Sequence, residues 1–129
     1  VTGVGFQGKV VICWHTRQTA IGSISGLQAG FGFAVSDTQR FCCAYASDTA
    51  VATSNTGKGS AAGIIRVFSD GTPTVDAAAD FVSFDADGFT VNWTTDVTAL
   101  AQIIHYVVLG GEAIRRAFVG QFAGPIGTG

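Results

Sequence analysis

Cys13 and His15 are the residues whose types and spacing come closest to a nucleophilic pair. They stand two positions apart in an apolar run, so on a strand they would share one face. Nucleophilic catalysis needs a thiol or hydroxyl beside a base, and a third group that orients the base. Neighbouring side chains on one face of a strand seldom align for proton transfer, and the sequence offers no recognisable third group. We therefore expect structural roles for both residues and no catalytic residue in the chain.

The acidic residues make no stronger case for chemistry. Glu112 is the single glutamate, and most aspartates stand in turn-like sequence, so the two carboxylates of a glycosidase are not recognisable. The run 85–88 could offer oxygens to calcium, but it lacks the spacing and the closing glutamate of an EF-hand. It predicts a β-turn instead, with a positive φ at Gly88. Because His15 and His105 have no patterned cysteines beside them, we expect no metal. Since no catalytic group is recognisable either, we also expect no cofactor and no enzymatic activity.

Polar and aromatic side chains could instead contact a glycan or a protein partner. Aromatic rings stack on sugar rings while polar groups form hydrogen bonds. The same aromatic residues could equally pack in a core, and the two adjacent arginines could form a solvated edge. The candidate contact residues are Tyr45, Asn55, Lys58, Trp93, Arg115 and Arg116.

The composition narrows the partners. The chain has 129 residues, a length that suits a single domain over residues 1–129. Only 12% of residues are charged and the net charge is -2, so neither a nucleic-acid-binding surface nor a basic membrane patch is expected. With 47% hydrophobic residues the chain can fill a core. So little charge protects a monomer poorly against self-association, and we expect a homo-oligomer.

The cysteines indicate a reducing compartment. Cys13, Cys42 and Cys43 make an odd count, and two adjacent cysteines cannot form an unstrained disulfide. We predict free thiols and assembly in a cytoplasm. On a strand Cys42 and Cys43 would point to opposite faces, so at least one of them is expected to be buried.

The elements that would position these residues are short strands between glycine-rich turns. Continuous apolar runs predict strands over 9–16 and 103–109, and alternating residues predict a hairpin of 31–35 with 41–45. Residues 63–69 and 89–94 predict further strands; in the latter Phe89, Val91 and Trp93 would face inward. Residues 77–84 fit a strand or a short helix, and 113–119 fit an edge strand.

The remaining segments predict loops. Small residues over 19–30 and polar residues over 48–62 predict two loops, and 97–102 predicts a helical turn. About eight short strands at regular spacing indicate an all-β protein, a jelly-roll-like β-sandwich.

Three blocks of sequence resemble structural proteins of tailed bacteriophages and prophages. They are the opening run over 2–12, the run Ser83-Phe84-Asp85-Ala86-Asp87-Gly88-Phe89-Thr90-Val91, and the apolar run over 104–111. The blocks occur in the family's order, although Gly8 stands where the family tends to have proline. The resemblance implies a concanavalin-like or jelly-roll sandwich found in tail fibres, tail-associated proteins and capsid accessories.

From this resemblance we expect a non-enzymatic virion structural protein, assembled in the host cytoplasm as capsid decoration or as a tail-associated unit. It would contact other virion proteins and form a trimer, since such sandwiches sit on three-fold axes. The order of strands and loops is also similar to the H-type lectin domain. That similarity implies the alternative function, carbohydrate binding, without assigning any sugar-contacting residue.

Overall fold

Eight β-strands form two antiparallel sheets in the computed structural model, which describes residues 1–23, 25–48, 56–69, 71–96 and 101–122. No helix occurs in these ranges. The expected all-β sandwich of about eight strands is therefore confirmed. The strands are Gly8–His15 (β1), Leu27–Ala34 (β2), Arg40–Ser47 (β3), Thr56–Ala61 (β4), Ile65–Phe68 (β5), Val75–Asp85 (β6), Gly88–Asp96 (β7) and Ile104–Gly110 (β8).

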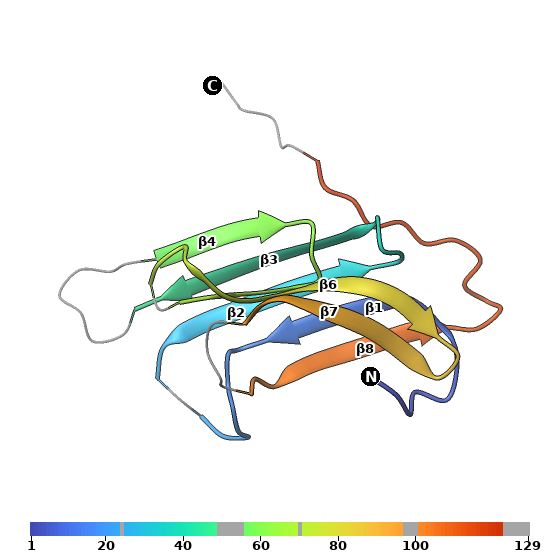
Figure 1. Cartoon of the computed structure of the whole chain (residues 1–129), viewed down its shortest axis with the longest axis horizontal. Helices are drawn as coiled ribbons and strands as arrows, with labels where there is room; N and C mark the ends of the chain where they lie inside the picture. The colour runs from blue at the N-terminus through green and yellow to red at the C-terminus, as the bar shows by residue number, and fades with distance from the viewer. Residues whose placement is uncertain (24, 49–55, 70, 97–100, 123–129) are drawn as a thin grey trace.

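The two sheets have five and three strands. The larger sheet has the order β4-β3-β2-β1-β8 and the smaller has the order β5-β6-β7. Figure 1 shows β6 and β7 lying across the larger sheet. The first four strands form a meander, the chain crosses to the second sheet for three strands, and β8 returns to pair with β1. The larger sheet is thus completed only by the last strand.

Apolar residues between the sheets form the core. Val11, Ile64, Val67 and Phe81 are the largest fully buried side chains. Beside this main cluster, Phe68 packs with small residues of β3 in a second cluster. Ile65 and Val67 of β5 are buried in this core, and Arg66 between them is half-buried. The side chains that hold the sheets together therefore come mainly from β1 and from the smaller sheet.

Two ion pairs join the larger sheet to β6. Arg17, just after β1, donates to a carboxylate oxygen of Asp76 at 2.8 Å. Arg40 at the start of β3 lies 3.1 Å from Asp80. Because both aspartates belong to β6, these contacts fix that strand above the larger sheet at two points.

Glycines let the sheets approach closely at β2 and β4. A β-carbon at Gly32 would collide with the backbone of Ile64, and one at Gly30 would collide with the ring of His15. At Gly59 a β-carbon would lie 2.9 Å from the ring of Phe68. Backbone of Ile64 requires a small residue at position 32, and the rings of His15 and Phe68 require one at positions 30 and 59. These glycines therefore reflect packing and not loop structure.

This packing corrects the two predicted loops. Residues 27–30 of the expected loop over 19–30 belong to β2, where they pair with β3. Residues 56–61 of the expected loop over 48–62 form β4, paired with the other side of β3. In both segments the small residues that resembled a loop are the ones the opposing sheet requires. Residues 49–55 lie outside the described residues.

Two further predictions have definite outcomes, and a third falls mostly outside the described residues. The open choice between strand and helix for 77–84 is settled as strand, within β6. The predicted edge strand over 113–119 is wrong, because the segment forms no strand pairing within the described chain. The helical turn over 97–102 falls mostly on residues 97–100, which lie outside the described residues; 101 and 102 have no regular structure.

The turn between β6 and β7 is held by the start of the chain. Asp87 accepts hydrogen bonds from the backbone N–H groups of Gly3 and Gly5, and Thr2 forms a β-bridge with Gly88. Asp85 pairs with Gly88, so Gly88 is the first residue of β7 and has no positive φ. That prediction was wrong. A glycine is needed because a β-carbon would strike the carbonyl oxygen of Val1.

Candidate interaction surface

The outward side of the larger sheet carries large apolar side chains. In β2, Phe31 and Phe33 alternate with Gly30, Gly32 and Ala34, and only the small residues face the other sheet. In β3 the same alternation places Cys42, Ala44 and Ala46 inside. Successive strand residues point to opposite faces, so the rings must point away from the core. We call this surface the outer face; its large members are Ile12, Trp14, Phe31, Phe33, Phe41, Tyr45, Val107 and Leu109.

Strand register gathers these side chains into one continuous surface. Trp14 pairs with Phe31, which pairs with Cys43, so the three side chains form a row across the sheet. His105 extends that row, its ring stacked on Trp14 with centroids 5.6 Å apart and planes 17° apart. Ile12, Phe33 and Phe41 form a parallel row. Directly opposed residues on one face are in side-chain contact.

The outer face remains open to solvent. Phe31, Phe33, Tyr45, Val107 and Leu109 each keep between 38% and 44% of their surface exposed. Neighbours in the sheet cover the flanks of each side chain, and its top is uncovered. Contiguous apolar patches of this kind mark interaction sites.

The size of the outer face suits a protein partner. Five strands about 4.8 Å apart and roughly eight residues long, at about 3.4 Å per residue, span roughly 24 by 27 Å, or about 650 Å². A stable interface takes about 800 Å² from each partner. The outward positions of β2, β3 and β8 carry no Asp, Glu, Lys or Arg, and β4 adds one charge, Lys58 beside Tyr45. The fitting partner is therefore another broad apolar surface with little charge.

Cys13 and His15 lie between the sheets, away from this surface. Both are buried, and burial raises the pKa of the Cys13 thiol to about 12. Burial also lowers the pKa of His15, an effect partly offset by the hydrogen bond between its Nε2 and the carbonyl oxygen of Arg66, at 2.9 Å. A buried protonated thiol is a poor nucleophile. The geometry gives these two residues no route to chemistry with a solvent-borne substrate.

Of the predicted contact residues, Tyr45 and Lys58 are brought together. They are cross-strand partners in β3 and β4 and line a shallow hollow on the outer face, with Cys43 and Ser60. Trp93 lies on the other sheet. It was expected to face inward, and it pairs with the buried Ala79, yet its side chain is 47% exposed, whereas Phe89 of the same strand is 3% exposed. Asn55 lies outside the described residues.

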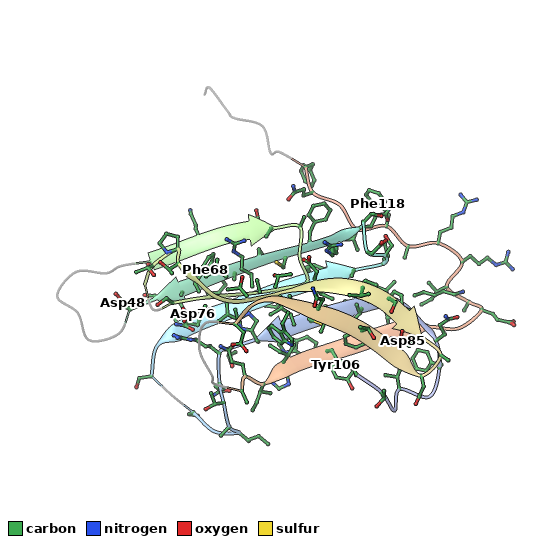
Figure 2. All side chains as sticks on the ribbon, in the orientation of Figure 1. Asp48, Phe68, Asp76, Asp85, Tyr106 and Phe118 are labelled. Carbon is green, nitrogen blue, oxygen red and sulfur yellow. The ribbon has the colours of Figure 1, made fainter. Side chains whose placement is uncertain are left out.

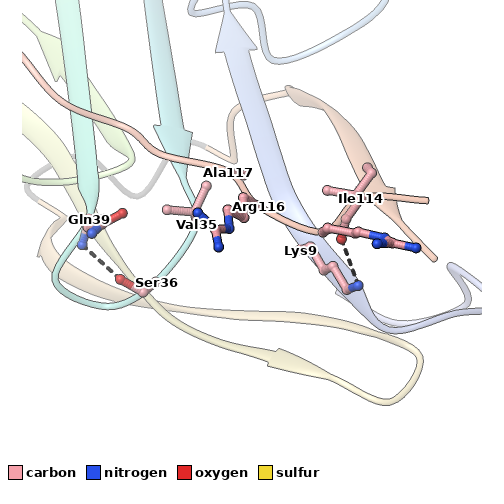
Figure 3. Close-up of a pocket in the computed structure, with 8 residues that line it drawn as sticks. Lys9, Val35, Ser36, Gln39, Ile114, Arg116 and Ala117 are labelled. Carbon is pink, nitrogen blue, oxygen red and sulfur yellow. Dashed lines mark hydrogen bonds between the residues drawn. The ribbon is translucent and has the colours of Figure 1, made fainter. Parts of the chain in front are cut away.

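Arg115 and Arg116 lie elsewhere, on the segment that follows β8. With Lys9, Ile114, Ser36 and Gln39 they border a surface pocket at the β2–β3 turn (Figure 3). Figure 3 also shows the ammonium group of Lys9 bonded to the carbonyl of Ile114. The five predicted contact residues that the structure describes thus do not form one site.

Sequence reasoning missed most of the outer face. The alternation of Phe31 and Phe33 with Gly32 and Ala34 was the available signal. Large side chains are normally assigned to the core side of a strand. That assignment is wrong for a strand whose core-facing side chains must be small. A run of glycine and alanine at every second position indicates which side meets the opposing sheet.

Comparison with models of protein families, with curated proteins and with solved structures gives no match. Within the described ranges, no cluster of three or more His, Cys, Asp or Glu side chains is placed to hold a metal ion. No helix of the described chain has the length and apolar character needed to span a membrane. The indications of function therefore come from the geometry of the outer face.

Proposed function

We propose that the protein is a non-enzymatic building unit that acts through assembly contacts made by the outer face. The observation that carries this proposal is the inverted arrangement of β2 and β3, with small residues in the core and large apolar residues outside. Aromatic side chains dominate the binding energy of protein interfaces. Covering rows of such side chains from water is favourable by about 25 cal/mol for each Å² of apolar surface.

A second copy of the chain is the partner that the outer face favours. The face is broad, apolar and nearly free of charge, so a charged partner surface would lose hydration without gaining an opposite charge. Another outer face matches it in size and chemistry. The homo-oligomer is expected to be a trimer, in which three outer faces meet around a three-fold axis and each contacts both neighbours; two faces packed directly on each other would instead close as a two-fold dimer.

The setting we propose is the virion of a tailed bacteriophage, as capsid decoration or a tail-associated unit that contacts other virion proteins. The resemblance of the three sequence blocks and the low charge of the chain support this setting. The β-sandwich is compatible with such a role, although this architecture serves many functions.

Sedimentation velocity over a range of protein concentrations tests the assembly role. We expect the natural chain to form an oligomer whose population rises with concentration. The double variant F31S/F33S should weaken association at least tenfold, because it removes two central aromatic contacts. Val82→Ser is the matched control: Val82 is an exposed apolar strand residue of the smaller sheet, so its loss should leave association unchanged. A 13.2 kDa monomer at every concentration would refute the proposal.

The second candidate function is carbohydrate binding at the hollow beside Tyr45. There a half-exposed aromatic ring lies next to Lys58 and Ser60, the combination of stacking surface and polar groups that sugars require. A glycan array should then give hits that Tyr45→Ala removes and Trp93→Ala retains. An array without hits would leave assembly as the function.

A further inference from the structure

The segment 113–122 presents large apolar side chains to solvent. Phe118 is 79% exposed and Phe122 is 92% exposed, far more than any side chain of the outer face. Figure 2 shows Phe118 projecting from this segment outside both sheets. The segment has no strand pairing among the described residues, although the pattern over 113–119 is typical of an edge strand. A strand-forming sequence therefore lies next to the sandwich without a partner strand.

Lys9 directs the segment away from the free edge of its own sheet. Its ammonium group donates to the carbonyl oxygens of Gly111 at 2.9 Å and Ile114 at 2.8 Å. Lys9 belongs to β1, which lies on the paired side of β8. The segment then borders the pocket at the β2–β3 turn. Pairing with β8 of the same chain would require both of these hydrogen bonds to break.

The free edge of β8 is suited to accept a strand. β8 ends the order of the larger sheet, so one side of its backbone has no described strand neighbour. Its sequence Ile-His-Tyr-Val-Val-Leu-Gly contains no proline, lysine or other charge that normally protects an exposed edge. Such an edge pairs readily with an added strand, through main-chain hydrogen bonds.

We propose that the segment 113–122 of one copy pairs as an additional strand with the free edge of β8 in a second copy. This inference rests on the proposed function and specifies how the copies are joined. In an extended strand Ile114, Phe118 and Phe122 share one face with Arg116 and Gly120, so three of its four large side chains are apolar. That face would continue the outer face of the second copy beside Val107 and Leu109, and each copy both gives and receives a strand, which allows a closed ring.

Hydrogen exchange and sedimentation of the full chain together test this contact. We expect the amides of β8 to gain protection as concentration rises and the oligomer forms. The variant F118S/F122S should weaken association at least tenfold and remove the added protection of β8. The control Ile21→Ser changes a fully exposed residue in the loop after β1 and should alter neither readout.

The outcomes separate this inference from the proposed function. If F31S/F33S weakens association while F118S/F122S leaves both association and β8 exchange unchanged, the outer face is the contact and the added strand is refuted. Protection of β8 that persists in F118S/F122S also refutes it. If the natural chain stays monomeric throughout, both proposals are refuted.

Discussion

The two sides of the five-stranded sheet differ in a way that reverses the usual distribution of side chains. Toward the smaller sheet, β2 and β3 present glycine, alanine and Cys42; toward solvent they present Phe31, Phe33, Phe41 and Tyr45. The inner side is limited by space, because backbone from the smaller sheet lies against it. The outer side has no such limit. On this sheet the size of a side chain is therefore set by how closely the opposing backbone approaches it, and not by whether the residue is buried.

The sharpest test of this comparison sets an inner phenylalanine against an outer one. Phe81 fills the space between the sheets and is 2% exposed. Phe81→Ala should lower the free energy of unfolding by about 3–5 kcal/mol, the cost of a large cavity. Phe33→Ala should cost the isolated chain less than about 1.5 kcal/mol, because the top of the Phe33 ring is already in water. Urea denaturation at low protein concentration measures both, and equal losses would contradict the comparison.

Substitutions that add bulk should lower stability on the inner side of the five-stranded sheet more than on its outer side. Gly32→Ala places a β-carbon against the backbone of Ile64, which cannot swing aside as a side chain would. We expect it to cost about 1–3 kcal/mol through overpacking. Ser60→Val adds bulk on the outer side of β4, opposite Cys43, and should change stability by no more than about 0.5 kcal/mol. A thermal-unfolding series that ranked Ser60→Val as the more damaging change would overturn the distinction.

Acid should weaken the inner side through His15. Burial lowers the pKa of His15 in the folded protein below its usual 6.5. Below about pH 6.5 the unfolded chain therefore binds more protons at this residue than the folded protein does. The contribution of neutral His15 to the free energy of unfolding is complete above that pH and is lost as the pH falls. The loss is at most about 1.4 kcal/mol for each pH unit.

His15→Gln keeps an N–H donor and removes the titration. Urea midpoints at about pH 7.5 and about pH 5 should therefore differ less in H15Q than in the natural chain. Identical profiles for H15Q and the natural chain would show that His15 does not titrate with folding.

The smallest expected effect concerns two adjacent thiols on opposite sides of one strand. Cys42 is buried and Cys43 is exposed, as the alternation predicts. Burial raises the pKa of Cys42 and of Cys13, so both should react slowly in the folded protein. A thiol reagent should label one cysteine rapidly, and Cys43→Ser should abolish that phase with at most about 0.5 kcal/mol of change in stability. Two rapid thiols in the natural chain would be inconsistent with this arrangement.

The sequence predicted the class of fold better than it predicted the outer face. Period-two alternation indicated the hairpin of β2 and β3 and the strand β7 correctly, and continuous apolar runs indicated β1 and β8. The boundaries failed at Gln28 to Gly30 and at Gly57 to Gly59, where a glycine required by the opposing sheet has the same appearance as a glycine in a loop. Composition alone does not distinguish these two uses.

The candidate surface was predicted only in part, for a related reason. Tyr45 and Lys58 were singled out and are neighbours, but the phenylalanines around them were not. Whether an alternating strand turns its large residues inward depends on what lies above its small ones. For β2 that information comes from Ile64, which is distant in the sequence, and for β4 it comes from Phe68 in the next strand; both contacts exist only in the folded protein.

The pairing of β1 with β8 also sets an order of events during synthesis. Roughly ninety residues separate the two strands, and a ribosome takes about 5–20 s to add them. During that interval one edge of β1 has no partner, and its run Val10 to Trp14 is as apolar as any in the chain. Contacts between such distant segments form slowly even after release, because a long loop must close first. The yield of folded protein should therefore depend on how quickly translation delivers the last strand.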